Sequence, residues 1–302
     1  MNPALQVLVC GANGFIGGHV VEALQRAGHQ VTCGSAQRRR TDLPHLPVDY
    51  GSDTAVATWL PRLQAFDTVV NAVGVLRDSA RRPMQAVHDA TPTALFQACA
   101  QAGVRRIVHM SALGIGSSDA DNATQYARTK RAAEAALQAL PSAGPSWVAL
   151  RPSVVLGPGG DAMALFSNLA RLPLLSMPGA ALDAKVQPVY VGDLAEAIAL
   201  LADPQSPERG VIEFGGARPM TLQELIATLR TARGTRRPAS VLRLPGWTGA
   251  LGARMGDFIP FSPWCTETRT MLERDSVASP APLAAWLGRA PRDLRDFAAD
   301  AH

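Results

Sequence analysis

The feature that most constrains this chain is the glycine-rich turn Gly11-Ala12-Asn13-Gly14-Phe15-Ile16-Gly17 near its N-terminus. An apolar run over 5–10 precedes the turn and predicts a buried strand, and 15–27 follows it with the pattern of a helix. Here the first glycine permits a tight turn, the second lets a pyrophosphate approach the backbone, and the third lets the helix pack closely on the strand. The helix N-terminus also offers unpaired N–H groups to phosphates. The sequence therefore predicts a dinucleotide site formed by Gly11, Asn13, Gly14, Phe15, Ile16 and Gly17; a tight turn without a ligand is the alternative.

Strand and helix patterns alternate through the first two thirds of the chain. Further strands are expected at 30–34, 68–73, 106–110 and 147–150, and further helices at 93–102 and 123–140. This alternation predicts an α/β fold, namely a Rossmann-type doubly wound parallel sheet covered on both faces.

Proline and glycine become frequent after Arg151, so we expect a second, smaller part of the fold there. The pattern of the region still predicts helices, one of them capped at its start by Thr221. We assign a dinucleotide-binding domain to 1–155, with 186–203 returning to it, and a smaller C-terminal substrate or partner lobe to 156–185 and 204–302.

Composition excludes several classes of protein. Of the 302 residues, 47% are hydrophobic and 18% are charged, which excludes disorder as the main state. The net charge of +4 is scattered and too small to favour nucleic acid as a partner. The cysteines Cys10, Cys33, Cys99 and Cys265 show no metal-binding spacing, so we expect no metal site and reduced thiols in a cytoplasmic protein.

The end of the second predicted strand indicates which dinucleotide is bound. NAD sites tend to carry an acidic residue there, whereas this chain has Ser35 and then Arg38-Arg39-Arg40. Arginine would hold a 2′-phosphate that an acid would repel. We therefore expect NADP rather than NAD, with Ser35 and Arg38 at the 2′-phosphate and Asp49 at the adenine amine; arginines that simply face water are the alternative.

A second specific signal is Tyr126-Ala127-Arg128-Thr129-Lys130, at the start of a predicted helix. Tyr126 and Lys130 lie on one face of such a helix. With three tyrosines and two lysines in the chain, about 0.02 such pairs are expected by chance. A nearby ammonium favours an ionised phenol, so the pair predicts a lowered pKa for Tyr126 and a proton exchanged with a carbonyl while a nicotinamide carries hydride.

Together the glycine turn and the Tyr126/Lys130 pair resemble the short-chain dehydrogenase/reductase superfamily. The resemblance to its extended branch covers nearly the whole chain. It includes the strings Asn71-Ala72-Val73-Gly74, Leu150-Arg151-Pro152-Ser153-Val154-Val155-Leu156-Gly157-Pro158-Gly159 and Val189-Tyr190-Val191-Gly192-Asp193. Three shorter strings are similar to the atypical group that includes the nucleotide-binding accessory subunit of respiratory complex I. They are His109-Met110-Ser111-Ala112-Leu113-Gly114, Gln187–Asp193 and Leu283–Arg289.

The resemblance implies roles for particular residues. Lys130 would bind the nicotinamide ribose, Asn71, Ala72 and Val73 would contact the cofactor, and Pro152 and Val154 would line the nicotinamide amide. Catalytic members also place a Ser or Thr about a dozen residues before the tyrosine, where this chain has Leu113. Ser111 is the nearest hydroxyl on that strand and is our candidate to orient substrate, with Ser117, Ser118 or no such group as alternatives.

Several functions remain open from the sequence. The first is an NADP(H)-dependent oxidoreductase of a small-molecule carbonyl or alcohol, with Tyr126 as proton donor. A non-catalytic NADP(H)-binding module that helps assemble a larger, respiratory or membrane-peripheral complex is the alternative, and an epimerase with bound cofactor is a third.

Two other groups of residues carry weaker expectations. We expect His88 and His109 to be structural histidines rather than bases. The apolar side chains Trp247, Met255, Phe258, Phe261 and Trp264 are expected to pack in a core, with a pocket cover or a membrane or partner contact as the alternatives.

Overall fold

A seven-stranded sheet organises the N-terminal part of the chain, and its pattern of pairs is that of a doubly wound fold. The computed structural model describes residues 3–80, 82–116, 124–235, 237–258 and 264–301. The strand order is β11-β6-β5-β4-β1-β2-β3. The strands are β1 (Gln6–Cys10), β2 (Gln30–Ser35), β3 (His45–Pro47), β4 (Thr68–Asn71), β5 (Arg106–Met110), β6 (Ser146–Pro152) and β11 (Gly210–Phe214). The five pairs from β3 to β6 are all parallel, which confirms the predicted fold class.

The register brings three strand ends together. Cys10 of β1 pairs with Asn71 of β4, and Asn71 pairs with His109 of β5. Because the strands are parallel, their carboxyl ends form one edge, which is where ligands bind in open α/β sheets.

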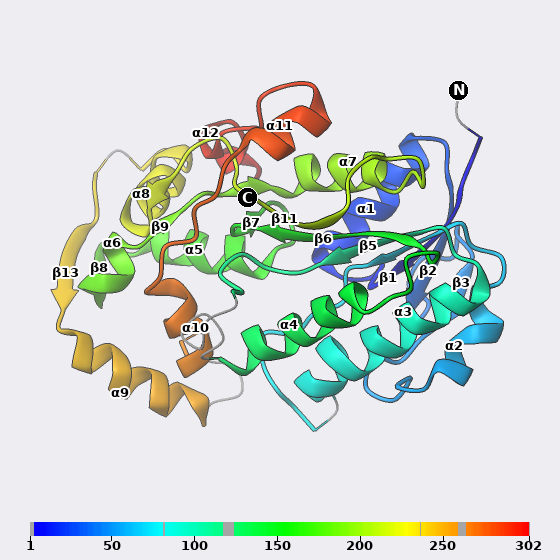
Figure 1. Cartoon of the computed structure of the whole chain (residues 1–302). Coiled ribbons are helices and arrows are strands. Elements are labelled where there is room, and N and C mark those ends of the chain that lie inside the picture. Colours follow the sequence, from blue (N-terminus) through cyan, green and yellow to red (C-terminus); the bar gives the residue numbers. More distant parts are fainter. Residues whose placement is uncertain (1–2, 81, 117–123, 236, 259–263, 302) are drawn as a thin grey trace. The chain divides into compact units, whose positions relative to one another are not determined.

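Helices cover this sheet on both faces (Figure 1). They are α1 (Phe15–Arg26), α2 (Val56–Leu63), α3 (Thr91–Ala102), α4 (Gln125–Gln138) and α7 (Val191–Leu201). A π-helical turn, η1 (Ala86–Ala90), leads directly into α3. The core between α2, α3, α4 and the sheet contains the fully buried side chains of Trp59, Leu95 and Phe96.

The chain divides into two compact units. The first is Met1–Arg151 with Leu194–Ile212, and the second is Pro152–Asp193 with Glu213–His302. The assignment of a nucleotide role to one part and a substrate or partner role to the other stays a prediction.

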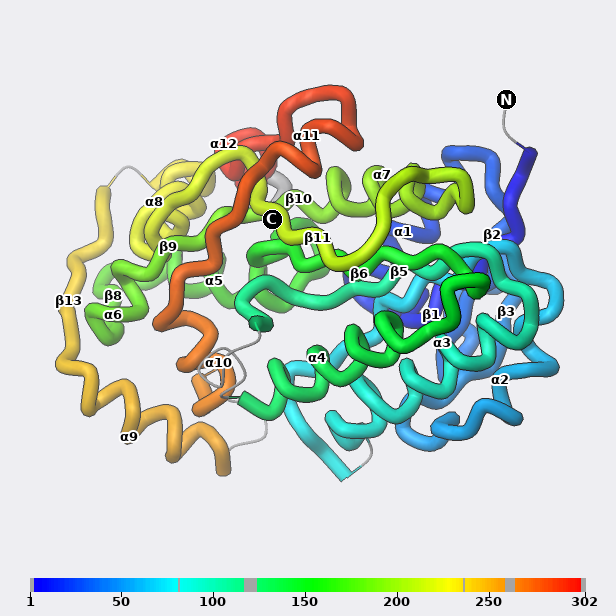
Figure 2. The backbone as a smooth tube through the Cα atoms, viewed as in Figure 1, coloured from blue at the N-terminus to red at the C-terminus, as the bar shows by residue number. Residues whose placement is uncertain are grey.

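The second unit is built from short strand pairs and helices. Its elements are β7 (Val155–Leu156), α5 (Asp161–Arg171), β8 (Leu174–Pro178), α6 (Gly179–Asp183), β9 (Lys185–Val186), β10 (Val189–Tyr190), β12 (Met220–Thr221), α8 (Leu222–Ala232), β13 (Ser240–Leu244), α9 (Gly246–Asp257), α10 (Thr266–Leu272), α11 (Ala281–Leu287), α12 (Leu294–Phe297) and the 3-10 helix η2 (Ala298–Ala301). Figure 2 follows the chain from β13 into α9. Phe166, Leu225, Leu229 and Phe297 lie in its core. Thr221 caps α8 as predicted, since its side chain accepts the Glu224 N–H at 3.1 Å.

Two local expectations are wrong. The strand expected over 68–73 ends at Asn71, where the chain turns and the Ala72 N–H donates to the Cys10 carbonyl. The core expected around Trp247 is not formed by its largest members, because Trp247, Met255 and Phe258 are 69%, 61% and 87% exposed. Trp264 is half-buried, and Phe261 lies outside the described residues.

Within the described ranges, none of the helices is long and apolar enough to cross a bilayer.

Candidate functional site

The glycine-rich turn joins β1 to α1 with no room for side chains at two of its glycines. Gly11 has φ +86°, and a Cβ there would stand 3.0 Å from the Ala72 backbone. A Cβ on Gly17 would stand 2.1 Å from the Gly11 carbonyl oxygen, so only glycine lets α1 begin this close to β1. Gly14 is exposed at the helix N-cap and no side chain caps the helix there, which leaves N–H groups of the first turn available. Phe15 and Ile16 are half-buried in that first turn.

The loop after β2 is fastened to this turn. The Asn13 Nδ2 donates to the Gln37 carbonyl at 2.7 Å, and the buried Ser35 hydroxyl donates to the same carbonyl at 2.8 Å. Asn13 and Ser35 thus lie close together, as expected for residues of one site. In the structure, however, both side chains donate hydrogen bonds to the loop backbone at Gln37.

The three arginines of that loop differ in their surroundings. The Arg38 guanidinium donates to the carbonyls of Arg40, Thr41 and Leu43 at 3.2–3.4 Å, and Arg40 pairs with Asp42 at 3.4 Å. Arg39 is exposed and has no partner within the described residues. Arg39, rather than Arg38, is therefore the arginine available to a phosphate. The exposed Asp49, expected at the adenine, accepts the Gly51 N–H at 2.9 Å in a tight turn.

A series of buried side-chain hydrogen bonds fixes the residues at the carboxyl end of β4. The Tyr50 hydroxyl donates to Asn71 Oδ1 at 2.9 Å, and Asn71 Nδ2 donates to His109 Nδ1 at 3.2 Å. Asn71 is completely buried, so its side chain shapes the edge and exposes no atom to a ligand. Ala72 and Val73 are half-buried and lie against Gly11. Burial, reinforced by Lys130 and His88, holds the pKa of His109 well below its usual value.

Helix α4 presents Tyr126 and Lys130 one turn apart. Thr124 caps the helix by accepting the Ala127 N–H at 3.1 Å, which places Tyr126 in the first turn. Lys130 is 3% exposed, and its Nζ lies 6.0 Å from the centroid of the Tyr126 ring. A Cβ on Gly74, just beyond β4, would stand 3.5 Å from this Nζ. The lysine therefore lies beside the same loop that contacts Gly11.

Burial favours the uncharged form of both side chains, so the pKa of the lysine falls and the pKa of the tyrosine rises. Burial lowers the pKa of Lys130 to about 8, against the opposing attraction of Glu134. Burial raises the pKa of Tyr126 to about 12, which corrects the expectation that Lys130 would lower it. The physical reason is that desolvation of the phenolate outweighs an ammonium that directs its hydrogen bond to the Met110 carbonyl, at 2.8 Å.

His88 is a neighbour of Tyr126 that the sequence pattern did not reveal. Its Nε2 accepts the Val75 N–H at 2.9 Å, which fixes the proton on Nδ1, and Nδ1 donates to Thr129 Oγ1 at 3.1 Å. The His88 ring packs edge-on against the Tyr126 ring, with 5.3 Å between centroids. Burial and Lys130 lower its pKa to about 2, so it is a neutral structural group.

Ser111 has a different partner from the one expected. Its hydroxyl donates to Glu134 Oε1 at 2.5 Å, and the same carboxylate accepts two bonds from Arg151, at 2.8 and 2.6 Å. Ser111, Glu134 and Arg151 are all buried. Because its proton is held by Glu134, Ser111 has none to donate to a substrate carbonyl. The alternatives Ser117 and Ser118 lie outside the described residues.

The remaining predicted residues belong to the second unit. Pro152 is the last residue of β6, and the Val154 carbonyl accepts the Val189 N–H at 2.9 Å, which ties β7 to β10. No cluster of three or more metal-ligating side chains occurs among the residues that the structure describes.

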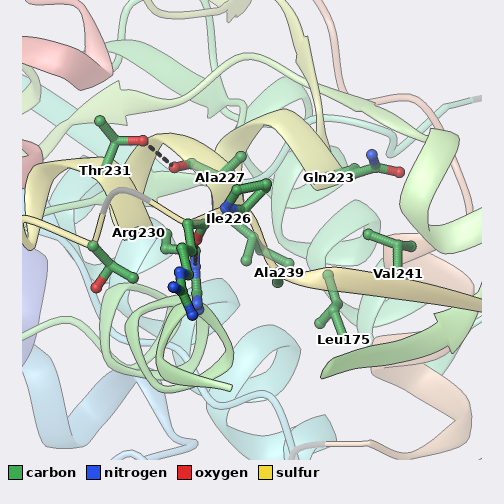
Figure 3. A pocket seen from close by; sticks show the side chains of 11 residues that line it. Leu175, Gln223, Ile226, Ala227, Arg230, Thr231, Ala239 and Val241 are labelled. Carbon is green, nitrogen blue, oxygen red and sulfur yellow. Dashed lines mark hydrogen bonds between the residues drawn. The ribbon is translucent and has the colours of Figure 1, made fainter. Parts of the chain in front are cut away.

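A shallow pocket of about 190 Å³ also lies in the second unit, between α8 and the β8–β13 pair (Figure 3). Leu175, Ile226 and Val241 contribute apolar walls. The Arg230 guanidinium beside it donates to the carbonyls of Arg237, Ala170 and Leu172, so it serves to join α8 to its neighbours.

Comparison with known proteins places these features in a family. Residues 7–214 match the model of the NAD dependent epimerase/dehydratase family. The chain is 26% identical over 286 residues to mouse NADH dehydrogenase [ubiquinone] 1 alpha subcomplex subunit 9, mitochondrial, covering 91% of this chain and 72% of the relative. It is 27% identical over 219 residues to a Caulobacter vibrioides ceramide reductase, covering 70% of this chain and 65% of that protein.

Solved structures share the fold. The Thermus thermophilus UDP-glucose 4-epimerase complex with NAD superposes with a TM-score of 0.70 at 24% identity, over 98% of this chain and 97% of that one. The architecture, the glycine turn and the family match agree, and the chain belongs to the NAD-dependent epimerase/dehydratase family.

Proposed function

We propose that this chain is an NADP(H)-dependent oxidoreductase that interconverts a carbonyl and an alcohol, with Tyr126 as the proton donor. The observation that carries the proposal is Lys130, a buried ammonium one turn from a protonated tyrosine at the carboxyl edge of the sheet. Two supporting facts are the family match and a relative whose name states a reductase activity.

The residues at the edge fit a dinucleotide. The turn at Gly11 and Gly17 has no space for a Cβ, and the exposed Gly14 presents the first-turn N–H groups of α1 to a phosphate. Lys130 has three N–H donors but makes one hydrogen bond within the described residues, to Met110. Ribose hydroxyls would satisfy the other two donors. The exposed Arg39 supports NADP over NAD, because a 2′-phosphate would be the anion that it lacks.

The chemistry assigned to the chain follows from these groups. A nicotinamide dinucleotide, when bound, supplies or accepts a hydride. Tyr126 is protonated at neutral pH and can donate that proton to a carbonyl oxygen in the direction of reduction, although burial raises its pKa to about 12 and so makes it a weaker acid than an exposed tyrosine. Lys130 orients the ribose, and His88 packs against the tyrosine ring and holds it in place.

A second candidate is a non-catalytic nucleotide-binding subunit of a larger complex. The observation that favours it is Ser111, directly after β5, whose hydroxyl donates to Glu134 and is therefore not directed at a substrate carbonyl. The relative from mouse is named as a subunit of NADH dehydrogenase. The Tyr126/Lys130 pair favours the enzyme, since a scaffold has no evident need of it.

Turnover separates the two candidates. NADPH oxidation is followed against a panel of carbonyl compounds, and for any substrate that is found, Tyr126→Phe should lower kcat by about 10²–10⁴ while leaving NADPH affinity unchanged. Tyr190→Phe, which removes a phenolic hydroxyl in the second unit, is the control and should retain the parent rate.

Two results would contradict the proposal. If NADPH binds tightly but no carbonyl or alcohol is turned over, the subunit candidate replaces it. If Tyr126→Phe works at the parent rate, the proton comes from another group.

A further inference from the structure

Helix α9 (Gly246–Asp257) buries its small residues and exposes its large apolar ones, the reverse of a typical surface helix. Its buried residues are the small ones, Gly249, Ala253 and Gly256. The fit on that side is close: a Cβ on Gly249 would stand 2.5 Å from the Pro178 side chain, and the Trp264 indole donates to the Gly249 carbonyl at 3.1 Å.

The opposite face of α9 carries the large apolar side chains. Trp247, Leu251 and Met255 follow one another at four-residue intervals and are 69%, 55% and 61% exposed, and Phe258, directly after the helix, is 87% exposed. Residues four apart lie on one face, so these side chains form a continuous ridge. An amphipathic helix normally turns such residues toward its own core. Leu242 of the preceding β13 and Leu174 of β8 add two half-exposed leucines to the same unit.

The segment that leads into and forms this ridge is rich in arginine in the sequence. Residues 231–258 contain the five arginines Arg233, Arg236, Arg237, Arg243 and Arg254 and the single acid Asp257, while α10, which packs against α9, adds Glu267 and is followed by Glu273, paired with Arg269. Arg243 pairs with Asp183 at 2.7 Å, whereas Arg254, within the helix itself, is exposed and has no partner among the described residues. Arginines beside exposed Trp, Leu and Phe are typical of helices that lie in the interface of an anionic bilayer.

We propose that the ridge formed by Trp247, Leu251, Met255 and Phe258 docks this protein onto an anionic lipid surface. A bilayer receives a row of exposed apolar side chains without a matching groove, and its negative charge complements Arg254 of the same helix and Arg243 of the preceding strand. The proposal concerns the second unit only and does not depend on the enzyme assignment.

Vesicle co-sedimentation of the full chain tests the proposal. Binding is measured to vesicles of phosphatidylcholine with phosphatidylglycerol and to vesicles of phosphatidylcholine alone. We expect binding to the anionic vesicles, little binding to the neutral ones, and a loss of about tenfold in Leu251→Ser, because one exposed leucine no longer enters the lipid. Leu200→Ser, which alters a leucine of α7 that is 52% exposed, is the matched control and should bind like the parent.

Tryptophan emission adds a direct readout of insertion. The emission of the parent should shift to the blue on anionic vesicles, and Trp247→Leu should bind but lose most of the shift. Lack of binding to anionic vesicles, equal binding to both vesicle types, or equal loss in Leu251→Ser and Leu200→Ser would each overturn the proposal. A dimer in solution that Leu251→Ser dissociates, without vesicle binding, would assign the ridge to a second copy of the chain instead.

Discussion

Helix α4 carries two buried charges one turn apart, and their surroundings are opposites. The carboxylate of Glu134 accepts hydrogen bonds from Ser111 and from two nitrogens of Arg151. The ammonium of Lys130 makes one hydrogen bond within the described residues, to the Met110 carbonyl. We call these the Glu134 region (Ser111, Glu134, Arg151) and the Lys130 region (Tyr126, Lys130, His88).

This difference in hydrogen bonding assigns a structural role to Glu134 and leaves Lys130 as the candidate for ligand binding. Removing one partner of a buried, hydrogen-bonded ion pair destabilises the fold, whereas a buried charge with unused donors is costly unless a ligand supplies the acceptors. The Glu134 region therefore holds β5, α4 and β6 together. Under the proposed function, the oxygen acceptors for the unused donors of Lys130 come from the ribose of a bound dinucleotide.

The largest expected effect comes from breaking the Glu134 region. Glu134→Ala leaves the Arg151 guanidinium buried without its counter-charge, so we expect the free energy of unfolding to fall by about 3–5 kcal/mol. Urea unfolding measures this change, with Glu22→Ala on the exposed side of α1 as the control. Parent-like unfolding of Glu134→Ala would mean that the two regions do not differ as described.

Lys130→Met should have the opposite sign. Because burial lowers the pKa of Lys130 from 10.5 to about 8, the unfolded chain binds this proton more tightly than the folded one. Below about pH 8 the parent therefore bears an unfavourable contribution of about 3 kcal/mol, which is relieved as the pH rises from about 8 to 10.5.

Without added nucleotide, Lys130→Met should thus be more stable than the parent at pH 7, and the gain should shrink as the pH approaches 10. Urea unfolding at pH 7 and pH 9 measures both values, and Lys185→Met, at the exposed second lysine of the chain, should show no such gain. A variant that is less stable than the parent at pH 7 would remove Lys130 from the functional account.

Ser111→Ala is expected to have a smaller effect. It removes one donor to a charged acceptor, so about 2 kcal/mol of unfolding free energy should be lost. NADPH affinity, and kcat where a substrate is known, should stay at the parent values because the hydroxyl faces Glu134. A loss of kcat as large as that of Tyr126→Phe would instead restore Ser111 as the group that orients substrate.

The contrast also shows which features the sequence could predict. The glycine turn and the Tyr126/Lys130 pair depend on spacing within one or two elements, and local spacing is visible in a sequence. The contact from Ser111 to Glu134 spans 23 residues and joins a strand end to a helix, so no local pattern reveals it. The raised pKa of Tyr126 is hidden from the sequence for the same reason, since desolvation depends on what packs around the ring.

The apolar residues around α9 in the second unit show that composition alone does not predict which side chains are buried. Trp247, Met255 and Phe258 have the residue types of a core, yet glycine and alanine occupy the buried face of α9. Composition indicates which side chains prefer burial, but only the close approach of Gly249 to Pro178 decides which face of the helix is turned inward.

The most direct test of the central claim is a calorimetric titration of the full chain with NADPH and NADH. The parent should bind NADPH more tightly than NADH. Gly14→Val should bind NADPH at least about 100-fold more weakly while remaining folded, because its side chain stands where the backbone must meet the pyrophosphate. Gly18→Ala, whose Cβ would stand 3.6 Å from the Ala12 carbonyl in ordinary contact, should bind like the parent. A folded Gly14→Val variant that binds NADPH with the parent affinity would contradict the account.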